Sequence, residues 1–290
     1  MSAPCRAAPA FPTVASGWLG RGAFRGTRGR PGATSPANAF VALLTALLAA
    51  AGCAPDADRT GTADAAATPP GRQYVVALDL SGSQNDARLA ESRRALDRII
   101  QKLSYGDRIV LLRVHQRQAQ EDDALRWADT VPRPRNPARP TSLDRERLEA
   151  VQRAASSVAR TFYDAEAAGR LPTTDLFATL HVAAEFMQDA AGRPTTLVLL
   201  SDMLQSAHGI EMSRPDGMPP PDWIDRNRER GLIPRLDGAC VLVVGADPTS
   251  PNGVAVREFW TRYFAAAGAR LHPENYRMLW TGDAPGGCGG

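Results

Sequence analysis

The sequence predicts an α/β domain with a doubly wound, mostly parallel central sheet and helices on both faces. Four short segments are continuously apolar, which is typical of strands buried on both sides of a parallel sheet. Segments with helical periodicity alternate with these strands, and that alternation favours the α/β class. The expected strands cover residues 75–80, 108–114, 195–200 and 239–245.

Helices are expected between the strands. Residues 88–103 carry apolar side chains at spacings of three, four and seven, which predicts an amphipathic helix against one face of the sheet. The same periodicity predicts helices over about 148–162, 176–190 and 254–267. Thr174 or Asp175 would cap the helix that begins at residue 176. The aromatic ridge of the last helix is interpreted as core packing; it consists of Phe259, Trp260, Tyr263 and Phe264.

Two stretches lack this regularity. Residues 116–145 are rich in charge and proline, which indicates a surface insertion with one edge strand near 125–131. Residues 205–237 are polar and contain an arginine-rich part that fits a short helix. The domain as a whole is expected over residues 73–283, with a flexible tail at 284–290.

Oxygen-bearing side chains follow the predicted strands at their carboxyl ends. Asp79, Ser81 and Ser83 follow the first strand, and Asp202 follows the strand that ends at residue 200. Thr174 lies at the start of a helix. The carboxyl ends of parallel strands share one edge of a sheet, so these side chains can converge there. Hydroxyl and carboxylate oxygens suit a hard divalent cation such as Mg²⁺.

Three segments in this order resemble the metal-ion-dependent adhesion site of von Willebrand factor A-type domains. They read D-L-S-G-S from Asp79, T-D-L-F-A-T-L from Thr174, and L-V-L-L-S-D ending at Asp202. The resemblance covers residues 73–271. It implies that Ser81 and Ser83 bind Mg²⁺ (or Mn²⁺ or Ca²⁺) through their hydroxyls, and that Thr174 binds directly or through water. Asp79 and Asp202 would hold waters or the metal itself.

The sequence departs from that pattern at two places. Leu171, Pro172 and Thr173 stand where such domains carry glycines, so Thr173 competes with Thr174 for the threonine role. Met203 follows the late acid where glycine is common, so that loop can take a different path.

The ligand set favours recognition over catalysis. Neutral hydroxyls and water-mediated carboxylates leave Mg²⁺ under-neutralised, with an open position for an external carboxylate. We therefore expect a non-enzymatic, metal-dependent module that binds an acidic residue of a partner protein. The alternative is a metal-dependent periplasmic hydrolase of phosphate or ester substrates, in which His115 would help to activate water. The sequence has no G-x-S-x-G, H-E-x-x-H or phosphate-binding glycine loop. A scaffold that keeps the fold without metal is the third interpretation.

The N-terminal segment has the organisation of a targeting signal. Residues 1–52 contain five arginines and no acid, and the apolar run 40–51 precedes Cys53 in the pattern A-A-G-C. That run is shorter than the ~20 residues that span a bilayer. It resembles a bacterial lipoprotein signal, which implies lipid attachment at Cys53 and a periplasm-facing location in the envelope. Ala54 favours the outer membrane over the inner one. Residues 53–72 contain no large apolar side chain and are interpreted as a flexible tether.

Charge and cysteine content agree with that location. The chain has 34 basic and 31 acidic residues, a formal charge of +3, and removal of five arginines with the signal leaves 29 against 31, or −2. No clustered basic face for nucleic acid is expected, the membrane contact is expected through the lipid alone, and the domain is expected to be a monomer. Cys240 and Cys288 remain as a pair in an oxidising compartment. Two interpretations stay open: a disulfide between them, or Cys240 as a small core residue.

Overall fold

The computed structural model describes residues 71–114, 126–167, 173–190 and 192–282. The expected signal segment, nearly all of the expected tether, Cys53, His115, Cys288 and the expected tail lie outside the described residues.

The centre of the domain is a six-stranded sheet in the order β3-β2-β1-β4-β5-β6. The strands are β1 (Gln73–Leu78), β2 (Arg108–Arg113), β3 (Arg126–Thr130), β4 (Thr195–Leu200), β5 (Cys240–Val244) and β6 (Tyr276–Arg277). All neighbours pair in parallel except β2 and β3. The chain builds outward from β1 to β2 and then crosses to β4 on the other side of β1. The doubly wound, mostly parallel fold is therefore confirmed.

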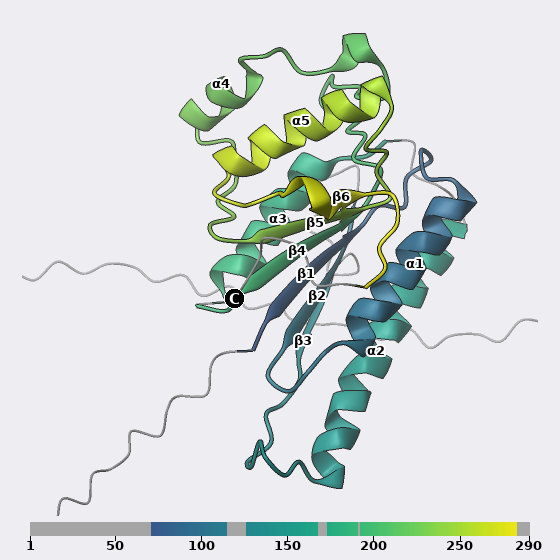
Figure 1. The fold of residues 1–290 in the computed structure, drawn as a ribbon, viewed down its shortest axis with the longest axis vertical. Helices are drawn as coiled ribbons and strands as arrows, with labels where there is room; N and C mark the ends of the chain where they lie inside the picture. The colour runs from purple at the N-terminus through teal and green to yellow at the C-terminus, as the bar shows by residue number, and fades with distance from the viewer. Residues whose placement is uncertain (1–70, 115–125, 168–172, 191, 283–290) are drawn as a thin grey trace, which may run out of the picture. The chain divides into compact units, whose positions relative to one another are not determined.

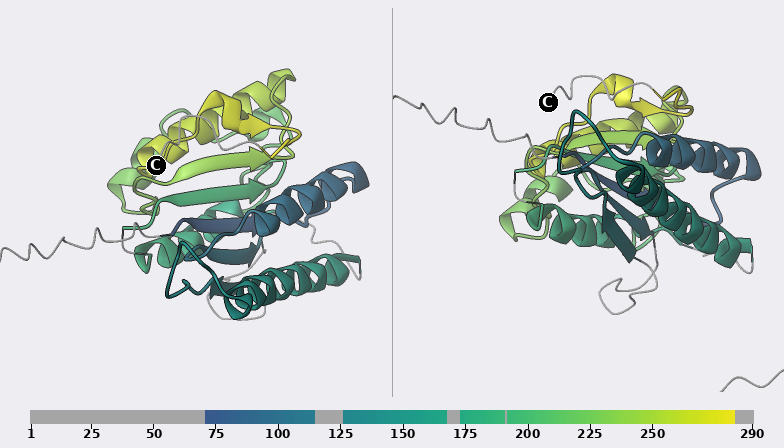
Figure 2. Two further views of the ribbon diagram at one scale, coloured as in Figure 1. Left: turned by 60° about the horizontal axis from the view of Figure 1, so that its bottom comes forward. Right: turned by 90° about the horizontal axis from the view of Figure 1, so that it is seen from below.

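Helices cover both faces of this sheet (Figure 1). The helices are α1 (Asp86–Gln101), α2 (Ser142–Ala167), α3 (Leu176–Gln188), α4 (Trp223–Glu229) and α5 (Pro251–Ala266). Helices α1 and α2 lie on one face, and α3 and α5 lie on the other, as the two rotated views also show (Figure 2). None of the described helices combines the length and the apolar character needed to cross a membrane.

The central strands are apolar throughout because each face of the sheet meets a helical layer. Val75 and Ala77 of β1 belong to the core cluster under α3 and α5. Val76 and Leu78 belong to the cluster under α1 and α2. Successive side chains of a strand point to opposite faces, so every position of β1 from Val75 onward needs an apolar residue. This explains the absence of alternation that the sequence shows.

The edge strands depart from this pattern. β3 is antiparallel to β2 and has exposed residues at its end, in agreement with the expected edge strand near 125–131. It and the first turn of α2 lie within the stretch expected to be a surface insertion. β6 was not predicted, because its two residues are too few to show a period.

The aromatic ridge of α5 is core packing, as predicted. Phe259, Trp260, Tyr263 and Phe264 are all at most 2% exposed. Three of these rings also contact Phe177 of α3. The centroids of Phe259, Trp260 and Tyr263 lie 5.3–6.3 Å from that of Phe177. The Trp260 indole N–H also donates a 2.9 Å hydrogen bond to the carbonyl of Met203, so this ridge positions the loop that follows β4.

Candidate functional site

The strands β1 and β4 bring their carboxyl ends together at the point where the chain changes direction in the sheet. Leu78 and Leu200 are register partners, so Asp79 on one strand lies beside Ser201 on the other. Loops that leave neighbouring strands in opposite directions open a crevice at this edge, which is where α/β folds bind ligands. The acids predicted at the two strand ends are therefore neighbours.

Asp79 is fully buried and held by three groups. The Ser201 hydroxyl donates a 2.5 Å hydrogen bond to its Oδ2, and the Ser81 N–H donates a 3.0 Å bond to its Oδ1. The Gln84 side chain also lies close enough to favour the charged form. Burial outweighs these contacts and raises the pKa of the Asp79 carboxyl above its ordinary value.

Ser81 and Ser83 present their hydroxyls to one point. Their Oγ atoms are 2.9 Å apart, although the residues are separated by Gly82. Ser81 is buried and Ser83 is exposed, so the pair extends from the sheet edge to solvent. The Ser83 hydroxyl also lies close to Asp202, where hydrogen bonding lowers the pKa of that carboxyl.

Asp202 is the second buried acid of the site. Its Oδ1 accepts a 3.1 Å hydrogen bond from the Leu204 N–H, and its Oδ2 lies 3.4 Å from the guanidinium of Arg88 on α1. Burial, and then the negative charge of Asp79, raise the pKa of Asp202 to about 6. The two carboxylates therefore face each other closely enough to disfavour each other's ionisation.

Thr174 is joined to the same loop through Ser206. The Thr174 N–H donates a 2.8 Å bond to the Ser206 hydroxyl, and the Ser206 N–H donates a 3.0 Å bond to the Thr174 carbonyl. Thr174 is buried, whereas Thr173 is half-buried and lines a surface groove. The cap of α3 is Asp175, whose Oδ1 accepts from the Ala178 N–H at 3.1 Å.

Met203 occupies a backbone conformation that favours glycine. Its φ angle is +65°, in the left-handed region, although its side chain is fully buried. Its N–H donates to the Ser201 hydroxyl at 2.9 Å, and its carbonyl accepts from Trp260. The loop thus places a methionine in a backbone conformation that is typical of glycine. Hydrogen bonds of the Met203 N–H and of the Met203 carbonyl hold this conformation.

A second group of residues beside the site was missed by the sequence analysis. The His208 Nε2 lies 2.6 Å from Oδ2 of Asp175, and Gln205 accepts a 2.7 Å bond from the Leu176 N–H. Like Met203, His208 has a positive φ, of 57°. These contacts join the loop after β4 to the start of α3. No local sequence signal indicates them, because each pair is separated by about 30 residues.

An open groove of about 620 Å³ adjoins this second group. It is lined by Thr173, Ser206, Ala207, His208, Gly209, Ile210, Glu211 and Arg214. Because Thr173 and Ser206 belong to the loops that hold Thr174, the groove is contiguous with the carboxyl edge of the sheet.

The oxygen set fits a hard divalent cation. Among the described residues, no three His, Cys, Asp or Glu side chains form a group that could hold a metal ion, so a cation here would need hydroxyl oxygens as well. Ser81 and Ser83 supply two such oxygens beside two buried acids, whose negative charges repel each other. A cation between them would offset that repulsion. Arg88 supplies the one positive group that contacts Asp202 among the described residues.

The described histidines form no cluster with these acids. His181 lies on α3 with its Nε2 3.2 Å from the carbonyl of Leu232. His272 precedes the short helical turn at Pro273–Asn275, and His208 contacts Asp175 rather than Asp79 or Asp202. The histidine of the hydrolase alternative, His115, is outside the described residues.

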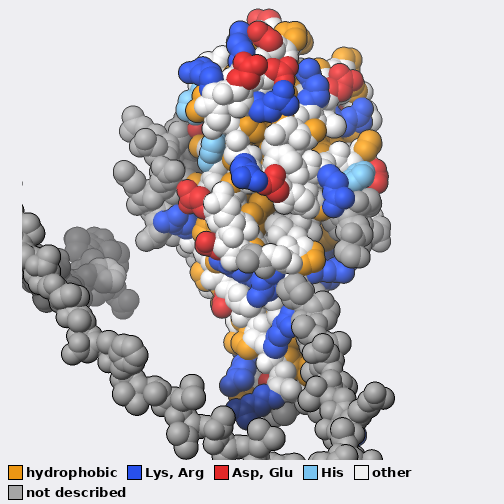
Figure 3. Space-filling view, turned by 90° about the vertical axis from the view of Figure 1, so that its left-hand side faces the viewer, with side chains coloured by type: hydrophobic (Ala, Val, Ile, Leu, Met, Phe, Trp, Pro, Cys, Tyr) orange, Lys and Arg blue, Asp and Glu red, His pale blue; other side chains and the backbone are white. Residues whose placement is uncertain are grey.

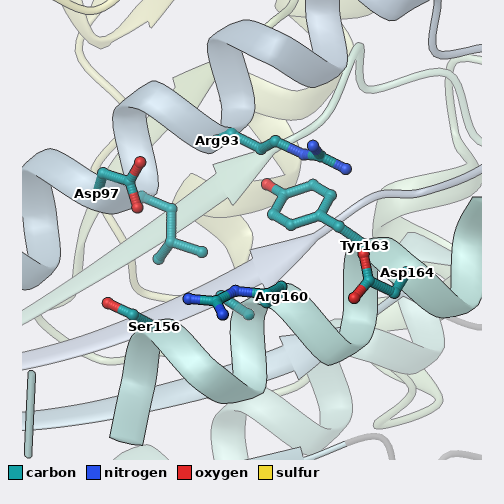
Figure 4. A pocket seen from close by; sticks show the side chains of 8 residues that line it. Arg93, Asp97, Ser156, Arg160, Tyr163 and Asp164 are labelled. Carbon is teal, nitrogen blue, oxygen red and sulfur yellow. The ribbon is translucent and has the colours of Figure 1, made fainter. Parts of the chain in front are cut away.

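A separate cavity of about 240 Å³ is lined by side chains of α1 and α2 (Figure 4). The Arg93 guanidinium lies 4.5 Å from the centre of the Tyr163 ring. The Tyr163 hydroxyl is buried and has no hydrogen-bond partner among the described residues. None of the predicted site residues lines this cavity.

Cys240 is buried at the start of β5 and is disulfide-bonded. It is the one cysteine among the described residues, so its partner lies outside them and pairing with Cys288 stays a prediction. The Sγ of Cys240 also accepts a 3.8 Å contact from the Asn275 amide.

The fold and the site together define a doubly wound α/β domain with an oxygen-rich cluster at its switch point. Neither a protein-family model nor a curated protein matches the sequence. Solved structures with a similar fold include a von Willebrand factor type A protein from Catenulispora acidiphila, at 14% identity and a TM-score of 0.36. They also include the open conformation of the pilus adhesin SpaC from Lactobacillus rhamnosus GG, at 11% and 0.39. A third is the human COPII-coat protein Sec24c, at 12% and 0.37.

These alignments cover 69%, 74% and 73% of this chain, respectively. They cover 43%, 28% and 30% of the three structures, so the chain matches less than half of each. Similarity at this level concerns the fold alone.

Proposed function

We propose that the domain is a metal-dependent protein-binding module that is held at the bacterial envelope by a lipid on Cys53. In this proposal a divalent cation, Mg²⁺ first among the candidates, binds at the carboxyl edge of the sheet. An acidic residue of an envelope partner protein would then complete its coordination.

One observation carries the proposal: the paired hydroxyls of Ser81 and Ser83 adjoin two buried, mutually repelling acids, Asp79 and Asp202. A turn that needed only a helix cap would have no reason to bury two carboxylates at neighbouring strand ends. Burying two neighbouring carboxylates is costly even where hydrogen bonds and Arg88 offset part of that cost, and such arrangements are common at functional sites. The resemblance of the three sequence segments to a metal-ion-dependent adhesion site supports the same assignment.

Each residue then has a distinct task. Ser81 and Ser83 would hold the cation through their hydroxyls, because Ser81 is buried and Ser83 reaches solvent. Asp79 would orient Ser81 through the hydrogen bond that it accepts from the Ser81 N–H. Asp202 would act on the cation directly or through water, and Thr174 would approach from the loop that Ser206 fixes. When bound, the cation supplies a positive, oxygen-seeking centre for an external carboxylate.

The groove next to Thr173 gives a partner chain a place to lie. It is open, adjoins the two loops that hold Thr174, and is bordered by Glu211 and Arg214, which contribute charges of both signs. We propose that the partner's acidic residue meets the cation while its flanking residues contact this groove. Side-chain contacts around the cation would provide the specificity that the metal alone lacks.

Asp79→Ala tests the metal dependence. Titration calorimetry with Mg²⁺ and Mn²⁺ should give binding for the wild-type protein and none for the variant. Capture of partners from an envelope extract should fail both for the variant and for wild type in chelator. Glu149→Ala is the matched control, since that acid is 60% exposed on α2, and it should behave as wild type. Capture of the same partners in all samples would remove the cation from the mechanism. A chelator-sensitive phosphatase or esterase activity lost in His115→Ala would favour the hydrolase.

The envelope location has its own test. Cys53→Ser should abolish lipid attachment, which mass spectrometry of the protein measures directly, and should leave only membrane association that about 0.5 M salt removes. A variant that stays membrane-bound with unchanged mass would contradict the lipoprotein proposal and leave the metal proposal intact.

A further inference from the structure

The two ends of the sheet have different chemistry, and the chain enters the domain at the end opposite the candidate site. In β1 the carboxyl end leads to Asp79, whereas Gln73 begins the strand. A six-residue strand separates these ends by roughly 20 Å. The described part of the chain therefore begins at the amino end of the sheet.

The connection between β3 and α2 leaves from this same amino end. Gln73 of β1 is the register partner of Arg108, and Arg108 is the register partner of Thr130, the last residue of β3. The Gly106 N–H donates to the Val131 carbonyl, and Gly71 packs directly on Gly106. Residues 131–147 consequently extend from the point where the chain enters the domain (Figure 1).

This connection is strongly basic. Residues 131–147 include five arginines and two acids. Three of the arginines, Arg135, Arg139 and Arg147, line one cavity of about 360 Å³. Arg133 packs against Gly106 beside the entry point. Lys and Arg side chains gather at the lower end of the face shown in Figure 3.

Five arginines against two acids give this stretch a formal charge of +3. Asp144 accepts hydrogen bonds from the Thr141 N–H and hydroxyl, so its carboxylate is engaged with the start of α2. The Oδ1 atom of Asp144 lies 4.0 Å from Nη1 of Arg147, which is a long distance for an ion pair. Leu143 lines the same cavity with 51% of its surface exposed.

We propose that this arginine surface, formed by Arg135, Arg139 and Arg147 around Leu143, docks on anionic phospholipid headgroups. The proposal rests on where the chain enters and on charge complementarity. If Cys53 carries a lipid and the residues after it are the flexible tether that the sequence predicts, their roughly 20 residues would span on the order of 25 Å, which keeps the surface within reach of the bilayer. Arginines attract anionic lipid, and an exposed leucine can insert among the headgroups.

Docking in this way orients the candidate site. Because the arginine surface and Asp79 lie at opposite ends of β1, contact with the bilayer would direct the carboxyl edge of the sheet away from the membrane. A partner protein would then reach the groove beside Thr173 without obstruction by the lipid. The contact itself requires neither the cation nor the lipid on Cys53, so it can succeed or fail independently of the proposed function.

Hydrogen exchange of the full chain with Cys53→Ser tests the proposal locally. Vesicles of phosphatidylcholine with about one third phosphatidylglycerol should slow amide exchange in residues 139–150, whereas pure phosphatidylcholine vesicles should not. The variant Arg135→Gln/Arg139→Gln/Arg147→Gln should lose this protection, with roughly 100-fold weaker local binding for three arginines. The matched control changes the same charge on and beside α4, as Arg226→Gln/Arg228→Gln/Arg230→Gln, and should keep it. Binding through residues 1–52 would be common to all samples.

Three outcomes would overturn the proposal. Protection of residues 139–150 by neutral vesicles would remove the role of charge. Unchanged protection in the triple arginine variant would place the contact elsewhere. Equal protection by inorganic phosphate or by single-stranded nucleic acid, without any effect of vesicles, would mean that the surface binds a different anion. Loss of protection at about 0.5 M salt would support an electrostatic contact.

Discussion

The hydroxyl of Ser201 lies 2.5 Å from Oδ2 of Asp79, so the residue after β4 holds the acid after β1. The same hydroxyl accepts a 2.9 Å hydrogen bond from the Met203 N–H. One side chain therefore ties together the two strand ends and the loop that carries Asp202. The candidate site depends on this serine as much as on the five residues expected to face a cation.

Ser201→Ala should destabilise the protein by about 1–3 kcal/mol, because a buried carboxylate loses its shortest hydrogen bond and the Met203 N–H loses its acceptor. Urea unfolding followed by circular dichroism measures the change. Ser157→Ala, at an exposed position of α2, should stay within about 0.5 kcal/mol of wild type. Equal stability of the two variants would show that Asp79 does not need Ser201.

Asp202 gives the metal-free protein a pH-dependent stability. Its folded pKa of about 6 exceeds its ordinary value of 3.8, so the folded state binds the proton more tightly than the unfolded state. Stability should therefore fall as pH rises from about 4 to 6, and level off above that, by roughly 1–3 kcal/mol from this group. Asp202→Asn should remove this part of the decline.

The measurement is urea unfolding in chelator between pH 4 and 7.5, with wild type and Asp202→Asn compared at each pH. The difference cancels the titration of unrelated groups. A wild-type curve that rises relative to the variant over this window would mean that Arg88 outweighs burial and Asp79, and that the acid is stabilising in the absence of metal.

Met203 offers a test of backbone strain against burial. Glycine would relieve a left-handed φ that costs about 1–2 kcal/mol, but it would leave a cavity where a fully buried side chain stood, at about 2–5 kcal/mol. We expect Met203→Gly to be destabilised by about 1–3 kcal/mol. Met203→Ala keeps the strain and should be about 1 kcal/mol less stable than the glycine variant. The opposite order in thermal unfolding would contradict the strain.

Tyr163→Phe should leave stability unchanged or raise it by up to about 1 kcal/mol. The hydroxyl is buried without a partner among the described residues, so its removal abolishes a desolvation cost and loses no hydrogen bond. The contact of Arg93 with the ring would persist. Thermal unfolding provides the measurement. A loss above about 1 kcal/mol would show that the hydroxyl has a partner in solution.

Cys240 should be protected from thiol reagents in the oxidised protein and become reactive under denaturing conditions in Cys288→Ser. The disulfide at Cys240 is observed, and the test identifies its partner. Mass spectrometry after alkylation locates each free thiol. Continued protection of Cys240 in Cys288→Ser would assign the bridge to another cysteine.

The sequence alone determined the fold class and most of the elements. Strands such as β4 were predicted with their observed bounds, because a strand covered on both faces must be continuously apolar. Asp79 and Asp202, predicted to follow two strands, are neighbours in the structure because parallel strand order brings carboxyl ends to one edge. The local apolar pattern was sufficient to predict an element wherever burial of that element required such a pattern.

Only the tertiary structure decided the contacts between distant segments. Ser201 and Asp79 are 122 residues apart, and His208 and Asp175 are 33 apart, so no local period could connect them. β6 was missed because its two residues pair with β5 only through tertiary packing. Only the strand register shows at which end of the sheet the arginines before α2 lie. Thr130 pairs with Arg108, and Arg108 pairs with Gln73 at the start of β1. Sequence pattern records which residues are buried, whereas strand register decides which of the polar ones meet.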